Sequence, residues 1–212
     1  MSDIVLGTKG LYRPTWDTIW DQWISDKQEF EPGVLDLVLE KTTKRGLAID
    51  AGAHIGTSTL RMAKHFSRVL SFEPHQVNFK CLKNNAGALP NVELYNAALG
   101  AQIRKCGLRY WDGNGGEYTV TSVGSNITMI TLDSLNLDSC DFIKVDTEGY
   151  ELKVLEGAKG TITEYRPAVI IEVNDTCFRH NITRDAASEY LKGLGAKSIG
   201  ECSYNRLFRF DA

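Results

Sequence analysis

The stretch that decides the fold is residues 47–57, LAIDAGAHIGT. A short aliphatic run ends in a carboxylate, Asp50, and the chain then turns through Gly52 and Gly56 into a pattern typical of a helix. Glycines let the backbone approach a ligand closely, and the free amides at the start of a helix attract anionic groups. The stretch therefore predicts a strand, a turn and a helix that either bind a nucleotide-like ligand or form a merely tight connection.

Beyond this stretch, short β-branched or aliphatic runs alternate with helical patterns, which is the order expected of a parallel sheet covered by helices. A doubly wound, Rossmann-like α/β fold is therefore expected, with helices on both faces of the sheet. The predicted strands are residues 47–50, 69–72, 92–96, 142–146 and 168–173. The predicted helices are residues 57–65, 76–86, 150–165 and 184–194.

Two further segments carry turn signals instead of a helical pattern. Residues 112–116, DGNGG, separate the runs 108–111 and 117–121, which predicts a β-hairpin inserted in place of one crossover helix. Residues 197–200 and 206–210 predict a closing antiparallel hairpin. Together with the five parallel strands, this closing hairpin gives a mostly parallel sheet of about seven strands.

Residues 1–45 are expected to form an N-terminal helical extension of the same domain. Trp16, Ile19, Trp20 and Trp23 recur there at helical spacing. Packing of this apolar face onto the sheet is favoured over a role as a substrate-side lid, because apolar stripes usually belong to the core.

Length, charge and cysteine spacing exclude several classes of protein. The 212 residues suffice for one domain with a sizeable core. With 24 Lys and Arg against 27 Asp and Glu, the net charge of -3 supplies no long-range attraction to nucleic acid. The N-terminus resembles no signal peptide and no window approaches a membrane span, so a soluble cytoplasmic protein is expected. The five widely separated cysteines predict reduced, structural thiols.

A second acidic residue follows the next predicted strand, where Glu73 lies in residues 71–74, SFEP. It is close to the roughly 20-residue offset from Asp50 at which an acidic side chain accepts the hydroxyls of a ribose. Ribose binding is favoured over the alternative, in which Glu73 caps the following helix. The two features together indicate a ligand that contains adenosine.

Charge then distinguishes between cofactors. Asp50, Glu73 and Asp146 are each expected to end a strand at the same edge of the sheet. Carboxylates there complement the sulfonium and ammonium groups of S-adenosylmethionine and repel the pyrophosphate of NAD or FAD. S-adenosylmethionine is therefore the predicted cofactor. Lys144, within the strand before Asp146, is expected to snorkel or to form a structural ion pair.

Three carboxylates that follow strands are candidates for catalysis. Asp146 and Glu148, in residues 141–151, DFIKVDTEGYE, either act directly on the reactants or have a structural role. Glu172 ends the fifth strand, and a carboxylate there either accepts a proton from a substrate hydroxyl or pairs with a helix. Glu151 is expected instead to stabilise the start of the next helix.

Six segments taken together resemble the FkbM methyltransferase family, in order and across about residues 29–175. They are AIDAGAHIGTSTL, SFEPHQVNFKCLKNN, NVELYNAALG, ITLDSL, DFIKVDTEGYELKVLEGA and RPAVIIEVN. The resemblance implies a class I methyltransferase fold, with residues 46–212 as the methyltransferase domain. Combined with the reasoning above, it gives as cofactor-binding residues Glu31, Asp50, Gly52, Ala53, His54, Gly56, Glu73, Pro74, Asn78, Asn96, Ala97 and Asp146. His54 departs from the Asn that the family often has.

The expected activity is O-methylation of a hydroxyl group on a sugar, a glycan or a small metabolite. Such an enzyme mainly aligns the hydroxyl oxygen with the methyl group, excludes water and removes the hydroxyl proton. The candidates for proton acceptance are Asp146, Glu148 and Glu172. Asp146 and Glu172 also have the oxygen ligands that magnesium prefers, but no His or Cys cluster supports a tight site and no metal is predicted.

Two rival functions are less well supported. An NAD-dependent sugar oxidoreductase is disfavoured because the chain has neither a GxGxxG motif nor a Tyr-x-x-x-Lys pair after the fourth strand. A module that binds S-adenosylmethionine without turnover is disfavoured by the intact glycine and acidic motifs. No motif identifies the acceptor, whose selection is expected at the Trp-rich N-terminus and at residues 101–130.

Overall fold

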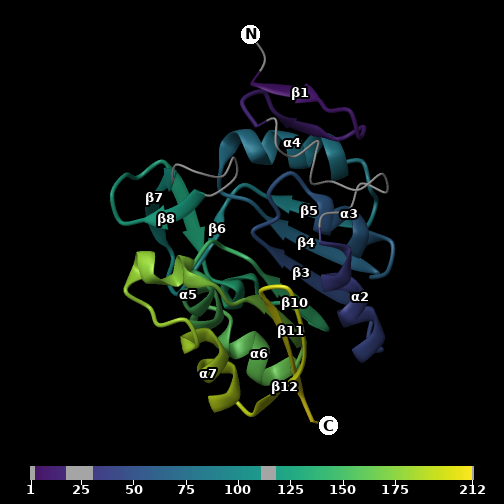
Figure 1. The fold of residues 1–212 in the computed structure, drawn as a ribbon, viewed down its shortest axis with the longest axis vertical. Helices are drawn as coiled ribbons and strands as arrows, with labels where there is room; N and C mark the ends of the chain where they lie inside the picture. The colour runs from purple at the N-terminus through teal and green to yellow at the C-terminus, as the bar shows by residue number, and fades with distance from the viewer. Residues whose placement is uncertain (1–2, 18–30, 111–117, 212) are drawn as a thin grey trace.

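A seven-stranded sheet forms the centre of the protein, as the computed structural model shows (Figure 1). The structure describes residues 3–17, 31–110 and 118–211. In chain order, the strands of this sheet are β3 (Leu47–Ala51), β4 (Arg68–Phe72), β5 (Val92–Tyr95), β10 (Phe142–Val145), β11 (Ala168–Glu172), β12 (Ala196–Cys202) and β13 (Asn205–Phe210). Their spatial order is β12-β13-β11-β10-β3-β4-β5.

The sheet is mostly parallel, which confirms the predicted fold class. Strands β11, β10, β3, β4 and β5 pair in parallel, whereas β13 runs antiparallel to both of its neighbours. The closing hairpin expected near the C-terminus is this β12–β13 pair, whose register shifts between Ser198 and Gly200. The carboxyl ends of the parallel strands consequently lie at one edge of the sheet, where ligands of open α/β folds bind.

Helices cover both faces of the sheet (Figure 1). They are α2 (Pro32–Lys41), α3 (Thr57–Ala63), α4 (Gln76–Ala86), α5 (Glu151–Glu156), α6 (Lys159–Tyr165) and α7 (Ala186–Gly193), with short 3-10 helices η1 (Leu132–Leu135) and η2 (Asp175–His180). In the described ranges, no helix combines the length and the apolar character needed to cross a membrane.

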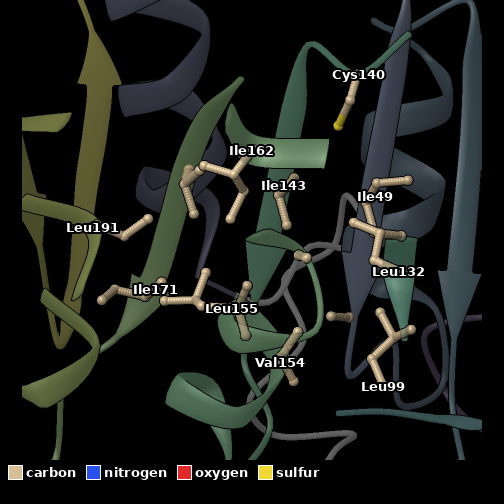
Figure 2. Close-up of a cluster of buried hydrophobic side chains, with 14 of the residues drawn as sticks. Ile49, Leu99, Leu132, Cys140, Ile143, Val154, Leu155, Ile162, Ile171 and Leu191 are labelled. Carbon is tan, nitrogen blue, oxygen red and sulfur yellow. The ribbon is translucent and has the colours of Figure 1, made fainter. Parts of the chain in front are cut away.

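The hydrophobic core has one part on each face of the sheet, because successive residues of a strand point in opposite directions. Ile143 of β10 packs with Leu155 of α5 and Ile162 of α6 on one face, as Figure 2 shows. Its neighbour Phe142 packs with Val38 of α2 on the other face. Burial on both faces explains why the strand sequences are nearly continuous apolar runs.

The helix predicted over residues 150–165 is interrupted, and that prediction is wrong at Gly157. A Cβ atom at Gly157 would lie 1.9 Å from the carbonyl oxygen of Gly100. The chain therefore needs glycine where it passes residue 100, and α5 and α6 form two short helices on either side.

The hairpin predicted from the run of turn residues is present, but it belongs to a larger unit. Strands β7 (Arg104–Tyr110) and β8 (Tyr118–Thr121) pair antiparallel, with Leu108 opposite Val120. They join β6 (Ala98–Leu99) and β9 (Ile127–Ile130) in a four-stranded sheet of order β6-β9-β7-β8. We call this unit the second sheet. The turn itself lies outside the described residues.

The N-terminal extension is not helical at its start, so that part of the prediction is wrong. Strands β1 (Ile4–Leu6) and β2 (Tyr12–Pro14) form an antiparallel pair beside α4 (Figure 1). The amide side chain of Asn85 holds this pair, because it accepts a hydrogen bond from Tyr12 N at 2.7 Å and donates one to Tyr12 O at 2.9 Å. Most of the Trp stripe lies outside the described residues.

The packing of the central sheet gives a stability prediction. Ile143→Ala should lower the free energy of unfolding by roughly 2–5 kcal/mol, because it leaves a cavity beneath α5 and α6. Urea denaturation measures this change. Ile103→Ala is the matched control, since Ile103 is 67% exposed and Ile143 is fully buried. Equal effects of the two substitutions would contradict the assigned core.

Candidate functional site

A cavity of about 360 Å³ lies at the carboxyl edge of the parallel strands. Its walls are the loops that follow β3, β4, β10 and β11, together with residues of the second sheet. Most of the candidate residues from the sequence line this cavity: Glu31, Gly52, Ala53, His54, Glu73, Pro74, Asn78, Ala97, Asp146, Glu148 and Glu172. The remaining candidates, Asp50, Gly56 and Asn96, do not line it.

Asp50 lies behind the cavity wall and is fully buried. One carboxylate oxygen accepts a hydrogen bond from Thr59 Oγ1 at 2.7 Å, and the other lies 3.6 Å from Lys144 Nζ. Asp50 lies one residue before the end of β3, and its side chain points into the protein interior. Its contacts are therefore with the protein interior, contrary to the expectation of direct ligand contact.

Gly56 and Asn96 shape the loops around the cavity from outside. Gly56 has φ 101° and starts α3, and a Cβ atom there would lie 2.8 Å from Leu82 Cδ1 of α4. Asn96 Nδ2 donates hydrogen bonds to the carbonyl oxygens of Glu73 at 2.9 Å and Pro74 at 3.2 Å. Gly56 thus allows the start of α3 to lie close to α4, Asn96 holds the backbone of the loop after β4, and neither residue lines the cavity.

Glu73 is fixed by the backbone at the end of β4. Its carboxylate accepts hydrogen bonds from His54 N at 2.9 Å and from His75 N at 2.7 Å, which ties the two loops together. Burial raises the pKa of Glu73 to about 7 in spite of these two hydrogen bonds. Each carboxylate oxygen can accept more than one hydrogen bond, so Glu73 retains capacity toward the cavity.

His54 is held in the left-handed backbone region, with φ 51°, in the turn between β3 and α3. Burial lowers the pKa of its imidazole to about 3, so the ring is neutral at physiological pH. A neutral ring does not add positive charge to the site.

Lys144 carries the positive charge of the cavity floor. Its ammonium lies 3.0 Å from Asp146 Oδ2 and 3.6 Å from Asp50 Oδ1, so it forms the structural ion pair that its sequence position predicted. Burial disfavours the charged form, but these two carboxylates outweigh that effect and raise the pKa of Lys144 above its ordinary value. Asp146 is thereby fixed at the edge of the sheet with its carboxylate toward the cavity.

Glu172 faces the same cavity from the end of β11. Its Oε2 atom is buried and has no hydrogen-bond partner in the part of the chain that the structure describes. Burial, reinforced by the negative charges of Asp146 and Glu148, holds the pKa of Glu172 far above its usual range. A hydroxyl or cationic group in the cavity would satisfy this oxygen.

The loop after β10 is held by Glu151 at the start of α5. The Glu151 carboxylate accepts hydrogen bonds from Thr147 N at 2.8 Å and Gly149 N at 3.1 Å, in keeping with the helix-start role expected for it. Glu148, between these two amides, has φ 57° and lies 3.6 Å from Arg179 Nη1 of η2. The carboxylate of Glu148 therefore reaches both the cavity and a neighbouring arginine.

Several cavity residues were not among the site residues predicted from the sequence, and one group of them comes from the second sheet. Leu108, Tyr118 and Val120 line the cavity from β7 and β8. The ring of Tyr118 stacks on His75, with centroids 3.8 Å apart, and this contact joins the second sheet to the loop after β4. The hairpin was visible in the sequence, but no local signal gave its position over the central sheet.

Comparison with known proteins agrees with this architecture. A family model described as the methyltransferase FkbM domain matches residues 50–192. The chain belongs to the FkbM methyltransferase family. A curated Dictyostelium discoideum protein, named as a candidate methyltransferase, is 48% identical over 50 residues, which cover 24% of this chain and 18% of that protein.

Solved structures share the fold of this FkbM family member. Methyltransferase FkbM from Methylobacillus flagellatus KT aligns with a TM-score of 0.53 and 21% identity, over 80% of this chain and 45% of that one. A ribosomal protein L11 methylase from Lactobacillus delbrueckii subsp. bulgaricus aligns with a TM-score of 0.53 and 12% identity, over 89% of each chain. This chain thus spans less than half the length of its FkbM relative of known structure.

The burial of Glu73 predicts that stability depends on pH. Its folded-state pKa of about 7 exceeds the ordinary value of 4.5, so its contribution to stability is complete below about pH 4.5 and is lost as the pH rises through about 7. In the wild type, the free energy of unfolding should therefore fall between about pH 5 and about pH 8. Glu73→Gln should make this fall smaller by a few kcal/mol. Urea denaturation across this range measures it.

Glu93→Gln serves as the control for this substitution. The Glu93 carboxylate is partly exposed, and its hydrogen bond with Arg68 holds its pKa below the ordinary value. Its titration therefore falls below this pH range, and the variant should keep the wild-type slope. A wild-type slope in Glu73→Gln as well would show that Glu73 is not the buried titrating group.

Proposed function

We propose that this protein is an S-adenosylmethionine-dependent methyltransferase that O-methylates a hydroxyl group of a sugar, a glycan or a small metabolite. The observation that carries the proposal is the charge of the cavity. Six carboxylates line it, and Lys144 is the one Lys or Arg among its described lining residues. The six are Asp17, Glu31, Glu73, Asp146, Glu148 and Glu172.

The cavity's donor set fits the chemical groups of this cofactor. Its carboxylates complement a sulfonium and an ammonium group, whereas the pyrophosphate of NAD would be repelled. Glu73 has lone pairs left for ribose hydroxyls. Phe72, Ala97 and Leu99 offer apolar surface for an adenine ring.

Glu31, which also lines the cavity, supports the assignment. Asn205 Nδ2 donates a hydrogen bond to its carboxylate at 3.3 Å. Burial, followed by the charge of Asp146, raises the pKa of Glu31. A cation bound beside Glu31 and Asp146 would relieve this repulsion, and the ammonium group of the methionine end has the required charge.

The chain's own residues then have three tasks in catalysis. S-adenosylmethionine, when bound, supplies a methyl group already activated by its sulfonium. The protein aligns the acceptor hydroxyl, excludes water and accepts the hydroxyl proton. Glu172 suits the last task, because a carboxylate with a raised pKa is a stronger base once it is deprotonated. Asp146, held by Lys144, orients the hydroxyl or shares the proton.

The polar groups around this carboxylate cluster favour a hydroxylated acceptor. Asn174 and Tyr150 lie two residues after Glu172 and Glu148, and Tyr204 O accepts a hydrogen bond from Val173 N at 2.7 Å. All three residues line the cavity, and their amide and hydroxyl groups can exchange hydrogen bonds with several acceptor hydroxyls. A sugar or a polyhydroxylated metabolite presents such a pattern.

Calorimetric titration tests the cofactor assignment. S-adenosylmethionine should bind and NAD should not, and Glu73→Ala should weaken the binding of S-adenosylmethionine roughly tenfold to a hundredfold by removing a charge-assisted hydrogen bond. Glu93→Ala, which removes an exposed carboxylate from the neighbouring strand β5, should leave the affinity unchanged. Binding of NAD without binding of S-adenosylmethionine would refute the assignment.

A transfer assay tests the catalytic role of Glu172. With labelled S-adenosylmethionine and pooled glycans and hydroxylated metabolites, the wild-type protein should give labelled product. Glu172→Gln should lower kcat roughly a hundredfold to ten-thousandfold while the cofactor still binds. Unchanged kcat in this variant would exclude Glu172 as the base, and cofactor binding without any transfer by the wild type would indicate a binding module.

A further inference from the structure

A second hollow of about 350 Å³ lies beside the β7–β8 pair. Arg109 and its partner Thr119 line this hollow and not the cavity, as the alternation of residues along a strand predicts, whereas Val120 lines both. We call it the basic groove. Its charged or titratable lining residues are Arg104, Arg109, Arg179 and His180.

The charge of the basic groove is opposite to that of the cavity. Three guanidinium groups line it, of which that of Arg179 lies 3.6 Å from the Glu148 carboxylate, and no Asp or Glu is found among its described lining residues. The chain as a whole is acidic, with a net charge of -3, so this concentration of arginine is local. The hydroxyl groups of Thr119, Thr121 and Ser122 add neutral hydrogen-bonding capacity to the same surface.

The basic groove and the cavity meet at the edge of β8. Tyr150 and Val120 line both hollows. Thr119 Oγ1 donates a hydrogen bond to the carbonyl oxygen of Glu148 at 3.0 Å and lies 2.7 Å from His180 Nε2. Arg179 lies 3.6 Å from the Glu148 carboxylate. A molecule that fills one hollow can therefore extend past Tyr150 into the other.

We propose that the basic groove binds a phosphate group of the methyl acceptor, and that the acceptor is a phosphorylated sugar or a comparable small phosphate ester. This inference rests on the methyltransferase function proposed above. Arginine forks match phosphate oxygens in pairs, so the arginines of the groove suit the several oxygens of a phosphate. The groove has no carboxylate among its described lining residues, whereas six carboxylates line the cavity.

Calorimetry with inorganic pyrophosphate as the probe tests the groove independently of catalysis. The wild-type protein should bind pyrophosphate, and Arg104→Gln and Arg109→Gln should each weaken binding about tenfold. Lys105→Gln is the matched control. It removes the same charge from the same strand, but Lys105 Nζ bonds to Thr128 Oγ1 at 2.8 Å and does not line the groove.

The outcomes separate this inference from the proposed function. Binding of S-adenosylmethionine by the two arginine variants should equal that of the wild type, since neither residue lines the cavity. Absence of pyrophosphate binding, or equal losses in Lys105→Gln, overturns the phosphate site and leaves the methyltransferase proposal standing. Pyrophosphate binding without any binding of S-adenosylmethionine overturns the function and, with it, the acceptor assignment.

A final arm distinguishes a small phosphate ester from a polynucleotide. A short single-stranded RNA should bind the groove no more tightly than pyrophosphate does, because a small hollow accommodates only its terminal phosphate. RNA that binds at least tenfold more tightly than pyrophosphate, and loses this advantage in Arg109→Gln, would overturn the assignment to a small acceptor.

Discussion

The ammonium of Lys144 is the charge on which the site depends. Two carboxylates lie against it: Asp50, which is fully buried on the neighbouring strand β3, and Asp146, which follows the strand of Lys144 and lines the cavity. Isolated buried charges are strongly destabilising, whereas a well-paired group is tolerated. This pairing allows a parallel sheet to hold ionised groups beneath its carboxyl edge, and it fixes the direction in which Asp146 presents its oxygens.

Glu31, Glu73 and Glu172 also line the cavity, and none of them forms an ion pair like that of Asp146 with Lys144 in the described residues. Glu31, Glu73 and Glu172 therefore have raised pKa values, with burial as the main cause in each case. Such a site is poorly suited to an anionic ligand and is stabilised by a cationic one. Arginines of β7 and η2 line the adjoining groove, which shares Val120 and Tyr150 with the cavity, so regions of opposite charge meet beside β8. This contrast favours one orientation of a ligand that carries both kinds of charge.

The sequence predicted those parts of the fold that depend on local hydrophobic periodicity and on turn-forming residues. The strands around Asp50 and Ile143, both hairpins and the count of strands in the main sheet follow from such patterns. The break at Gly157 and the location of the second sheet depend on contacts between distant segments, such as Gly157 with Gly100. The same limit applies to the site: Asp50 was predicted to end its strand, but β3 continues to Ala51 and the Asp50 carboxylate lies beside Lys144 instead of lining the cavity.

The register shift in β12 has a consequence for association between chains. An edge strand exposes unpaired backbone groups that invite another strand to add to the sheet. The irregularity between Ser198 and Gly200 interrupts the regular spacing of these groups, and the exposed charges of Lys197 and Glu201 flank it. A regular ladder cannot continue across this edge, so the geometry of β12 opposes the sheet-to-sheet growth that begins aggregation.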